Sequence, residues 1–269
     1  MDILFLGTGA ADWPAPGKNV GNGRRCSSLL LDGHILIDCG QYAADAVEEF
    51  GVAVDDLTDI IISHPHSDHV DILELEKILR RRSAGLPPVM VHVNRTMGCA
   101  LIPWHREKLL HLRVYSVDEA FDLGGGVHVQ ALPANHMNDM PGPVAAHLFL
   151  TTDSGETLLY LCDGSWLRDQ AWQTLFAWHE KTGRSIDCVI WELTCGRQLD
   201  WRFFVGHCNI DMVRLEAGVL LKYGILRHDT AMLCSHIAHY LDDDHDSLAQ
   251  AIAPDYLLAY DGMKFSTNK

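Results

Sequence analysis

Apolar and polar positions follow two different periods along the chain. Continuous apolar runs of about four to eight residues predict buried strands, and longer segments with an apolar residue every third or fourth position predict amphipathic helices. Residues 27–38 hold two such runs around Asp32-Gly33, a dipeptide favoured in tight hairpin turns. The pattern predicts strands within 27–38, 58–63, 88–93, 127–136, 144–152, 157–164, 186–193 and 229–236, and helices at 41–51, 71–85, 96–111, 166–181 and 211–224.

The order of these elements indicates an α/β protein. Strands come first in hairpins and later alternate with helices, and two mixed β-sheets with helices outside them fit that order better than one doubly wound sheet. No internal repeat and no linker rich in proline, glycine or serine interrupts the 269 residues. We therefore expect a single domain over residues 1–269.

Composition and charge narrow the range of partners. Acidic residues outnumber basic ones, 36 to 21, which gives a formal charge of −15 with neutral histidines. Such a charge repels polyanions, so we expect no nucleic-acid partner. The eight cysteines form no C-x-x-C pair, which suits reduced thiols, and no apolar segment reaches the ~18 residues of a membrane span. We therefore expect a cytoplasmic protein that does not bind membranes.

The stretch "IIISHPHSDHV", residues 60–70, gathers four potential metal ligands directly after an apolar run. In an extended segment the side chains of His64 and His66 project to the same side, where neutral imidazoles can bind one metal ion. Asp68 and His69 follow within a turn and can reach a second ion beside the first. Because packing gives no reason to gather these residues, the motif predicts metal binding over a structural role.

Two adjacent divalent ions need more ligands than these four side chains provide. His136, Asp163 and His236 each stand at the carboxyl end of a predicted apolar strand, and an aspartate can bridge two ions. A single histidine after a strand is more often structural. Three such residues at equivalent positions favour the hypothesis that they complete the metal site.

In this order, the residues resemble the metallo-β-lactamase superfamily of metallohydrolases. The likeness runs through "LGTGAA", "CSSLLL", "ILIDCG", "IIISHPHSDH" and "LYLCDG", while "GHCNID", "SHIAH" and "YDG" are similar to the PhnP-like, phosphoribosyl cyclic phosphodiesterase branch. The resemblance implies a four-layer αββα sandwich of two mixed β-sheets flanked by helices. The early loop "NVGNGRRCSS" holds only Cys26 where that branch has a cysteine cluster for a structural zinc, so no structural zinc is expected.

The same resemblance implies a dinuclear metal centre and a hydrolytic reaction. A hydroxide bridging the ions would attack a small phosphodiester, cyclic ones included. His207 would contact the reacting phosphate or its leaving group as a general acid, and Asp68 would also orient the nucleophile. The implied ligands are His64, His66 and His136 for one ion, Asp68, His69 and His236 for the other, and Asp163 as the bridge.

Several alternatives stay open at this point. The same scaffold serves lactonases and nucleases that trim structured RNA, and a metal-binding accessory protein without hydrolytic activity is a different class. Histidine and carboxylate ligands favour two zinc ions here, with manganese or iron as alternatives. The expected partner is a small anionic substrate, and a homodimer is one option for the oligomeric state.

Overall fold

The chain folds into two compact units, each built around one seven-stranded sheet. The computed structural model describes residues 1–14, 23–140, 142–198, 205–239 and 244–267. The first unit comprises Met1–Ser116 with Ala259–Lys269, and the second Val117–Leu258. The predicted fold class, two mixed β-sheets flanked by helices, is confirmed. The single domain over residues 1–269 stays a prediction.

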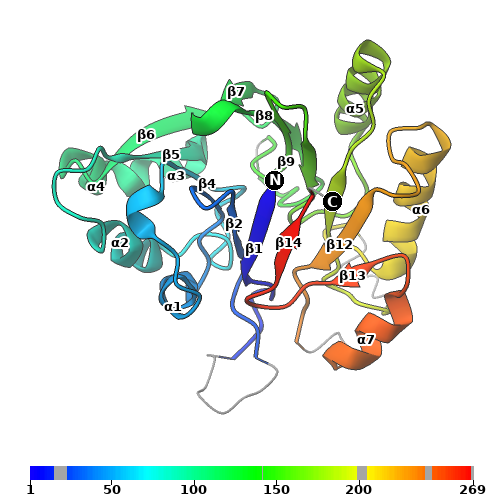
Figure 1. Cartoon of the computed structure of the whole chain (residues 1–269), viewed down its shortest axis with the longest axis horizontal. Helices are drawn as coiled ribbons and strands as arrows, with labels where there is room; N and C mark the ends of the chain where they lie inside the picture. The colour runs from blue at the N-terminus through cyan, green and yellow to red at the C-terminus, as the bar shows by residue number, and fades with distance from the viewer. Residues whose placement is uncertain (15–22, 141, 199–204, 240–243, 268–269) are drawn as a thin grey trace. The chain divides into compact units, whose positions relative to one another are not determined.

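The sheet of the first unit has the strand order β14-β1-β2-β3-β4-β5-β6. β1 to β3 pair antiparallel, and β3 to β6 pair parallel. The last strand of the chain, β14 in red, lies beside the first, β1 in blue (Figure 1). The strands are β1 (Asp2–Gly7), β2 (Ser28–Leu31), β3 (Ile35–Ile37), β4 (Asp59–Ile61), β5 (Val89–Asn94), β6 (Leu110–Tyr115) and β14 (Lys264–Ser266). The α-helices are α1 (Ala43–Glu49), α2 (Ile72–Arg80), α3 (Arg95–Gly98) and α4 (Ile102–Arg106).

The central strands of this unit are apolar on both faces. Every residue of β3 is buried, as are all three of β4. Continuous apolar strands of this kind are typical of parallel sheets that are covered by crossover helices. Helices α1 and α2 each lie on such a crossover, between β3 and β4 and between β4 and β5.

The prediction of a single helix at residues 96–111 is wrong. The segment instead forms the short helices α3 and α4 with a turn of 3₁₀-helix, Cys99–Leu101, between them. Pro103 stands in the first turn of α4, where proline begins a helix more readily than it continues one. Leu110 and His111 already belong to β6, which pairs parallel with β5.

The sheet of the second unit has the order β13-β12-β11-β10-β9-β8-β7. β7 to β10 pair antiparallel, and β10 to β13 pair parallel. The strands are β7 (Ala120–Asp122), β8 (Val127–Pro133), β9 (Ala146–Thr152), β10 (Thr157–Tyr160), β11 (Cys188–Glu192), β12 (Ala231–Ser235) and β13 (Leu257–Leu258). The helices are α5 (Asp169–Thr182), α6 (Ile210–Lys222) and α7 (His245–Ile252).

Buried residues of this sheet and of its three helices form one apolar cluster, with Trp191 among its largest fully buried members. Asn209 accepts a hydrogen bond from the N–H of Met212 and so caps the first turn of α6. Among the described residues, no helix has both the length and the apolar character needed to span a bilayer.

Candidate metal centre

The histidine motif of the first unit lies where parallel strands end. Asp38 follows β3, and His64 begins the loop that follows β4. Neighbouring parallel strands bring their carboxyl ends to one edge of the sheet, which explains why these residues meet. Asp71, which ends the loop, caps α2 by accepting from the N–H groups of Leu73 and Glu74.

The backbone around Asp68 is held by an unusually close approach. The N–H of Cys39 donates to the carbonyl of His69 at 2.8 Å, and the N–H of Asp71 donates to the carbonyl of Cys39 at 2.7 Å. A Cβ atom on Gly40 would lie 2.1 Å from the carbonyl oxygen of Asp68. Only glycine therefore allows the two segments to pack at this distance.

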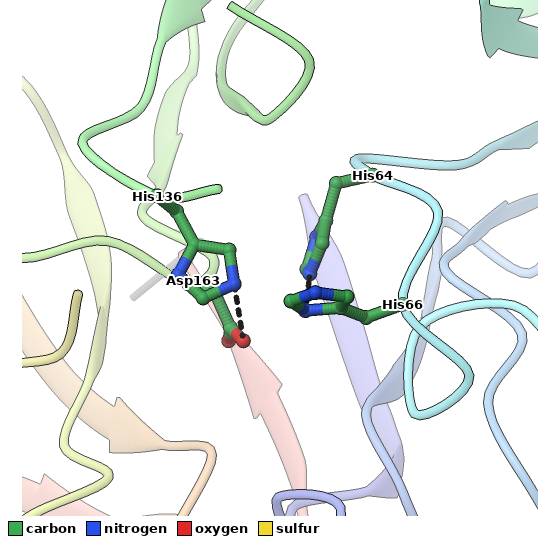
Figure 2. A group of neighbouring side chains, drawn as sticks. All are labelled: His64, His66, His136 and Asp163. Carbon is green, nitrogen blue, oxygen red and sulfur yellow. Dashed lines mark hydrogen bonds and ion pairs between the residues drawn. The ribbon is translucent and has the colours of Figure 1, made fainter. Parts of the chain in front are cut away.

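Hydrogen bonds orient the side chains of this set. His69 Nδ1 lies 2.8 Å from Asp38 Oδ2, and its Nε2 lies 3.8 Å from Asp68 Oδ2. His64 Nε2 lies 3.2 Å from His66 Nδ1, the contact dashed in Figure 2. His64, Asp68 and His69 are at most 4 % exposed. Contact with water therefore does not stabilise these polar side chains.

The second unit brings together His136, Asp163 and His236, which follow β8, β10 and β12. Each oxygen of Asp163 faces a different histidine: Oδ1 is 2.9 Å from His236 Nε2, and Oδ2 is 3.6 Å from His136 Nε2. Figure 2 shows the second of these pairs. All three side chains are buried.

The hydrogen bonds of these histidines suit a metal ion. His136 Nδ1 lies 3.1 Å from the carbonyl oxygen of Gly206, and His69 Nδ1 lies against the Asp38 carboxylate. Both partners only accept, so each ring carries a proton on Nδ1, and in the neutral ring the lone pair is on Nε2. His136 therefore turns a lone pair toward the carboxylate of Asp163. Buried electron-pair donors that face one another fit a cation.

His207 lies among the histidines of the second unit. Its ring centroid is 5.0 Å from that of His136 and 5.9 Å from that of His236. Its Nδ1 lies 3.3 Å from Glu192 Oε1 and 3.1 Å from Thr194 Oγ1. Burial opposes protonation of the ring, but the charge and hydrogen bond of Glu192 outweigh burial and raise the pKa of His207.

Glu192, His207 and His236 also form a group that could hold an ion by themselves, because their ligand atoms lie within 4.8 Å of one another. His207 could therefore be a general acid, as predicted, or a metal ligand. Its removal would leave the metal content unchanged in the first case and lower it in the second.

Four residues around these sets were not part of the ligand prediction. Asp38, Ser63, Glu192 and Thr194 contact the histidines from behind. Asp38 and Glu192 stand at strand ends in the sequence, which is a usable signal for a carboxylate, whereas serine and threonine at such positions carry none.

The seven predicted ligands thus fall into a set of four in the first unit, His64, His66, Asp68 and His69, and a set of three in the second, His136, Asp163 and His236. We call these the four-residue set and the three-residue set. Both are compatible with metal binding.

Comparisons with solved structures identify the fold. Solved structures of similar fold include the metallo-β-lactamase fold protein YhfI from Bacillus subtilis, with 18% identity, a TM-score of 0.71 and coverage of 98% of this chain and 99% of that one. A diphosphatase from the PhnP family has 18% identity, a TM-score of 0.70 and coverage of 98% and 96%. Human tRNase Z, short form, has 21% identity, a TM-score of 0.67 and full coverage of both chains, 100% and 100%.

The chain therefore has the metallo-β-lactamase fold, and the predicted resemblance to that superfamily, PhnP-like members included, is confirmed.

Sequence comparison adds a second group of similar proteins. Residues 1–99 match the family model described as Anti-Pycsar protein Apyc1. The Anti-Pycsar protein Apyc1 of Paenibacillus harenae is 28% identical over 187 residues, which are 61% of this chain and 73% of that protein. Together, these likenesses support the prediction of a metal-dependent hydrolase.

Proposed function

We propose that the protein is a hydrolase of small phosphodiesters, cyclic ones included, that works with two divalent metal ions. The four-residue and three-residue sets would join at one centre. His64, His66 and His136 would hold one ion, and Asp68, His69 and His236 the other, with Asp163 shared. The observation that carries the proposal is Asp163, whose two oxygens face two different histidines at 2.9 and 3.6 Å.

Bound ions at this centre would supply Lewis acidity that polarises water and the phosphoryl oxygens. Zinc fits the donors best, because all are imidazole nitrogens or carboxylate oxygens, and manganese or iron would fit a similar set. Against two divalent cations, the carboxylates of Asp68 and Asp163 leave the centre net positive. A small anionic substrate is therefore attracted even though the whole chain carries −15.

His207 would supply the proton that the departing alkoxide needs. The Glu192 carboxylate favours the protonated ring, as the raised pKa of His207 indicates. With Nδ1 directed at Glu192 and Thr194, the other ring nitrogen, Nε2, is the atom left to donate. Asp68, 3.8 Å from His69 Nε2, would accept a hydrogen bond from the attacking water and orient it.

The experiment that tests this function is a substrate panel with metal-replete protein. The panel contains bis-p-nitrophenyl phosphate, 2′,3′- and 3′,5′-cyclic nucleoside monophosphates, a lactone, a thioester and a structured RNA. We expect turnover of the phosphodiesters that is lost on chelation and restored by zinc or manganese. Turnover of the lactone or thioester alone would contradict the phosphodiesterase, and hydrolysis of no substrate would favour a non-hydrolytic metal protein.

The RNA arm of the panel addresses the likeness to tRNase Z. Among the basic residues, the run Arg80–Arg82 is engaged within the first unit: Arg80 pairs with Glu76 and Glu107, and Arg81 pairs with Glu48. These arginines are therefore poor candidates for a phosphate-binding surface, which supports small substrates over nucleic acid. Cleavage of the RNA faster than of the small diesters would reverse this preference. A homodimer remains one option for the oligomeric state, to be checked by mass photometry.

A further inference from the structure

We propose that Thr194 is a positioning residue whose hydroxyl fixes the proton of His236 on Nδ1 and so presents Nε2 as a metal-binding lone pair. The inference rests on the metal-binding part of the proposed function. It concerns the residues behind the centre, in the second unit alone.

The first step is the direction of the hydrogen bond between Thr194 and Glu192. Glu192 Oε2 accepts from the Thr194 N–H at 2.7 Å, and Glu192 Oε1 accepts from the Cys208 N–H at 2.7 Å. Both carboxylate oxygens are therefore acceptors. The Thr194 hydroxyl, 2.6 Å from Glu192 Oε2, must donate its one proton to this carboxylate.

The second step follows because a hydroxyl group has one proton to donate and two lone pairs that accept. Once its proton points at Glu192, Thr194 Oγ1 can only accept. His236 Nδ1 lies 2.7 Å from this oxygen, so the ring donates through Nδ1 and leaves Nε2 as the nitrogen for a metal ion. That nitrogen lies 2.9 Å from Asp163 Oδ1, on the side of the predicted ligands. His207 Nδ1, at 3.1 Å, can donate to the second lone pair of the same oxygen.

The first unit repeats the construction with different residues. The N–H and hydroxyl of Ser63 donate to the two oxygens of Asp38 at 2.7 and 2.9 Å, and Ser63 Oγ lies 3.1 Å from His64 Nδ1. A hydroxyl that donates to a buried carboxylate and accepts from a predicted ligand therefore occurs twice. Because this arrangement occurs in both units, we infer that both hydroxyls have the same role, which is to orient the histidine ligand and fix the position of its proton.

The same pair without a histidine provides a matched control. The N–H and hydroxyl of Thr157 donate to Asp187 Oδ2 at 3.0 and 2.9 Å, and Thr157 is fully buried. This hydroxyl accepts from the Asp187 N–H, and no histidine of the described residues hydrogen-bonds to it. Thr157→Val therefore removes a buried threonine–carboxylate bond of the same kind without touching a predicted ligand.

The experiment compares Thr194→Val, which keeps the shape and removes the hydroxyl, with Thr194→Ser, which restores it. Metal affinity is measured by zinc competition titration. The tautomer of His236 is read in metal-free, ¹⁵N-histidine-labelled protein by the ¹⁵N shifts of its ring, assigned by their loss in His236→Gln. We expect Nδ1 of His236 to carry a proton in the wild type and to carry it only in part of the molecules of Thr194→Val, whose affinity for one of the two ions should fall about 10- to 100-fold. Thr194→Ser and Thr157→Val should keep the wild-type affinity.

The inference is overturned if Nδ1 of His236 carries no proton in the metal-free wild type, or if Thr194→Val binds both ions as tightly as the wild type. Should Thr194→Val not fold, the tautomer of the wild type still decides. A wild-type protein that binds no metal would instead contradict the proposed function, and the tautomer measurement would remain valid in that case.

Discussion

Four of the five predicted histidine ligands have their Nδ1 atoms against a partner from their own unit. The partners are the hydroxyls of Ser63 and Thr194, the carboxylate of Asp38 and the carbonyl of Gly206, in contact with His64, His236, His69 and His136. Through these bonds the rings turn their Nε2 atoms to the other side. Such outer contacts fix ring orientation and raise the basicity of the ligand atom.

Replacement of His207 by alanine separates its two conceivable roles. As a general acid, its loss should lower the turnover of phosphodiesters by about 10²- to 10⁴-fold, because an unprotonated alkoxide is a poor leaving group. The number of metal ions per chain should stay that of the wild type. Steady-state kinetics and elemental analysis of one preparation provide both values. Loss of an ion in this variant would assign His207 to the group it forms with Glu192 and His236.

Gly40→Ala tests the close approach that holds Asp68. The added Cβ would meet the carbonyl oxygen of Asp68 at 2.1 Å and Cys26 Cβ at 2.8 Å, so the backbone must shift. We expect a loss of about 1–3 kcal/mol in the free energy of unfolding and a weaker metal affinity. Gly218→Ala in α6 is the control, since nothing lies within 4 Å of its Cβ. A Gly40→Ala protein with wild-type stability and metal content would contradict this interpretation.

At residue scale, the candidate ligands could be selected from the sequence because they stand directly after apolar strands, where the fold gathers side chains; their binding of metal stays a prediction. Thr194 and Ser63 could not, because serine and threonine are common at strand ends. Their role depends on which atoms lie within hydrogen-bond distance, and that is decided by the three-dimensional packing of β11 against β12 and of β3 against β4.

At the scale of elements, the parallel strands determine where the chemistry lies. In the second unit Asp163, Glu192 and His236 stand at the ends of β10, β11 and β12, which are neighbours in the sheet. The long strands and helices could be read from apolar periodicity. The interrupted helices α3 and α4, the strand β6 that follows them, and the edge strands β7 and β14 could not, because they depend on their tertiary neighbours more than on a local pattern.

Glu216 of α6 gives a prediction about stability and pH. Burial raises the pKa of Glu216 from 4.5 to about 7. The hydrogen bond from the Leu167 N–H lowers this pKa, and the negative charge of Glu192 raises it further. Between these values the unfolded chain has lost the proton and the folded chain still holds it, so stability falls as pH rises through this window. At about 1.4 kcal/mol per pKa unit the full loss is about 3 kcal/mol.

The variant Glu216→Gln has no proton to lose and keeps an oxygen for the Leu167 N–H, which Glu216 Oε1 binds at 2.6 Å. Its free energy of unfolding should therefore exceed that of the wild type at pH 8 by more than it does at pH 5, as measured by urea denaturation. Glu180→Gln, on an exposed position of α5, is the control. An equal difference between Glu216→Gln and the wild type at both pH values would show that Glu216 titrates normally.

At the scale of the whole molecule, the proposed dinuclear centre would need donors from both units, because neither set alone suffices for two ions. The four-residue set offers three imidazoles and one carboxylate, and the three-residue set offers two imidazoles and one carboxylate. In the proposed centre, the two sets together would give three ligands for each ion and a shared aspartate. The formal charge of −15 discourages large polyanions, and the proposed ions would attract a small anionic substrate.

The number of divalent ions bound per chain tests this account most directly. Elemental analysis of zinc-replete, dialysed protein should give two ions per chain in the wild type. Removing one ligand from either unit, with His64→Ala or His236→Ala, should lower that number, and Asp163→Ala should affect both ions. A wild-type chain that retains no ion or a single one, or an Asp163→Ala chain that still retains two, would contradict the shared dinuclear centre.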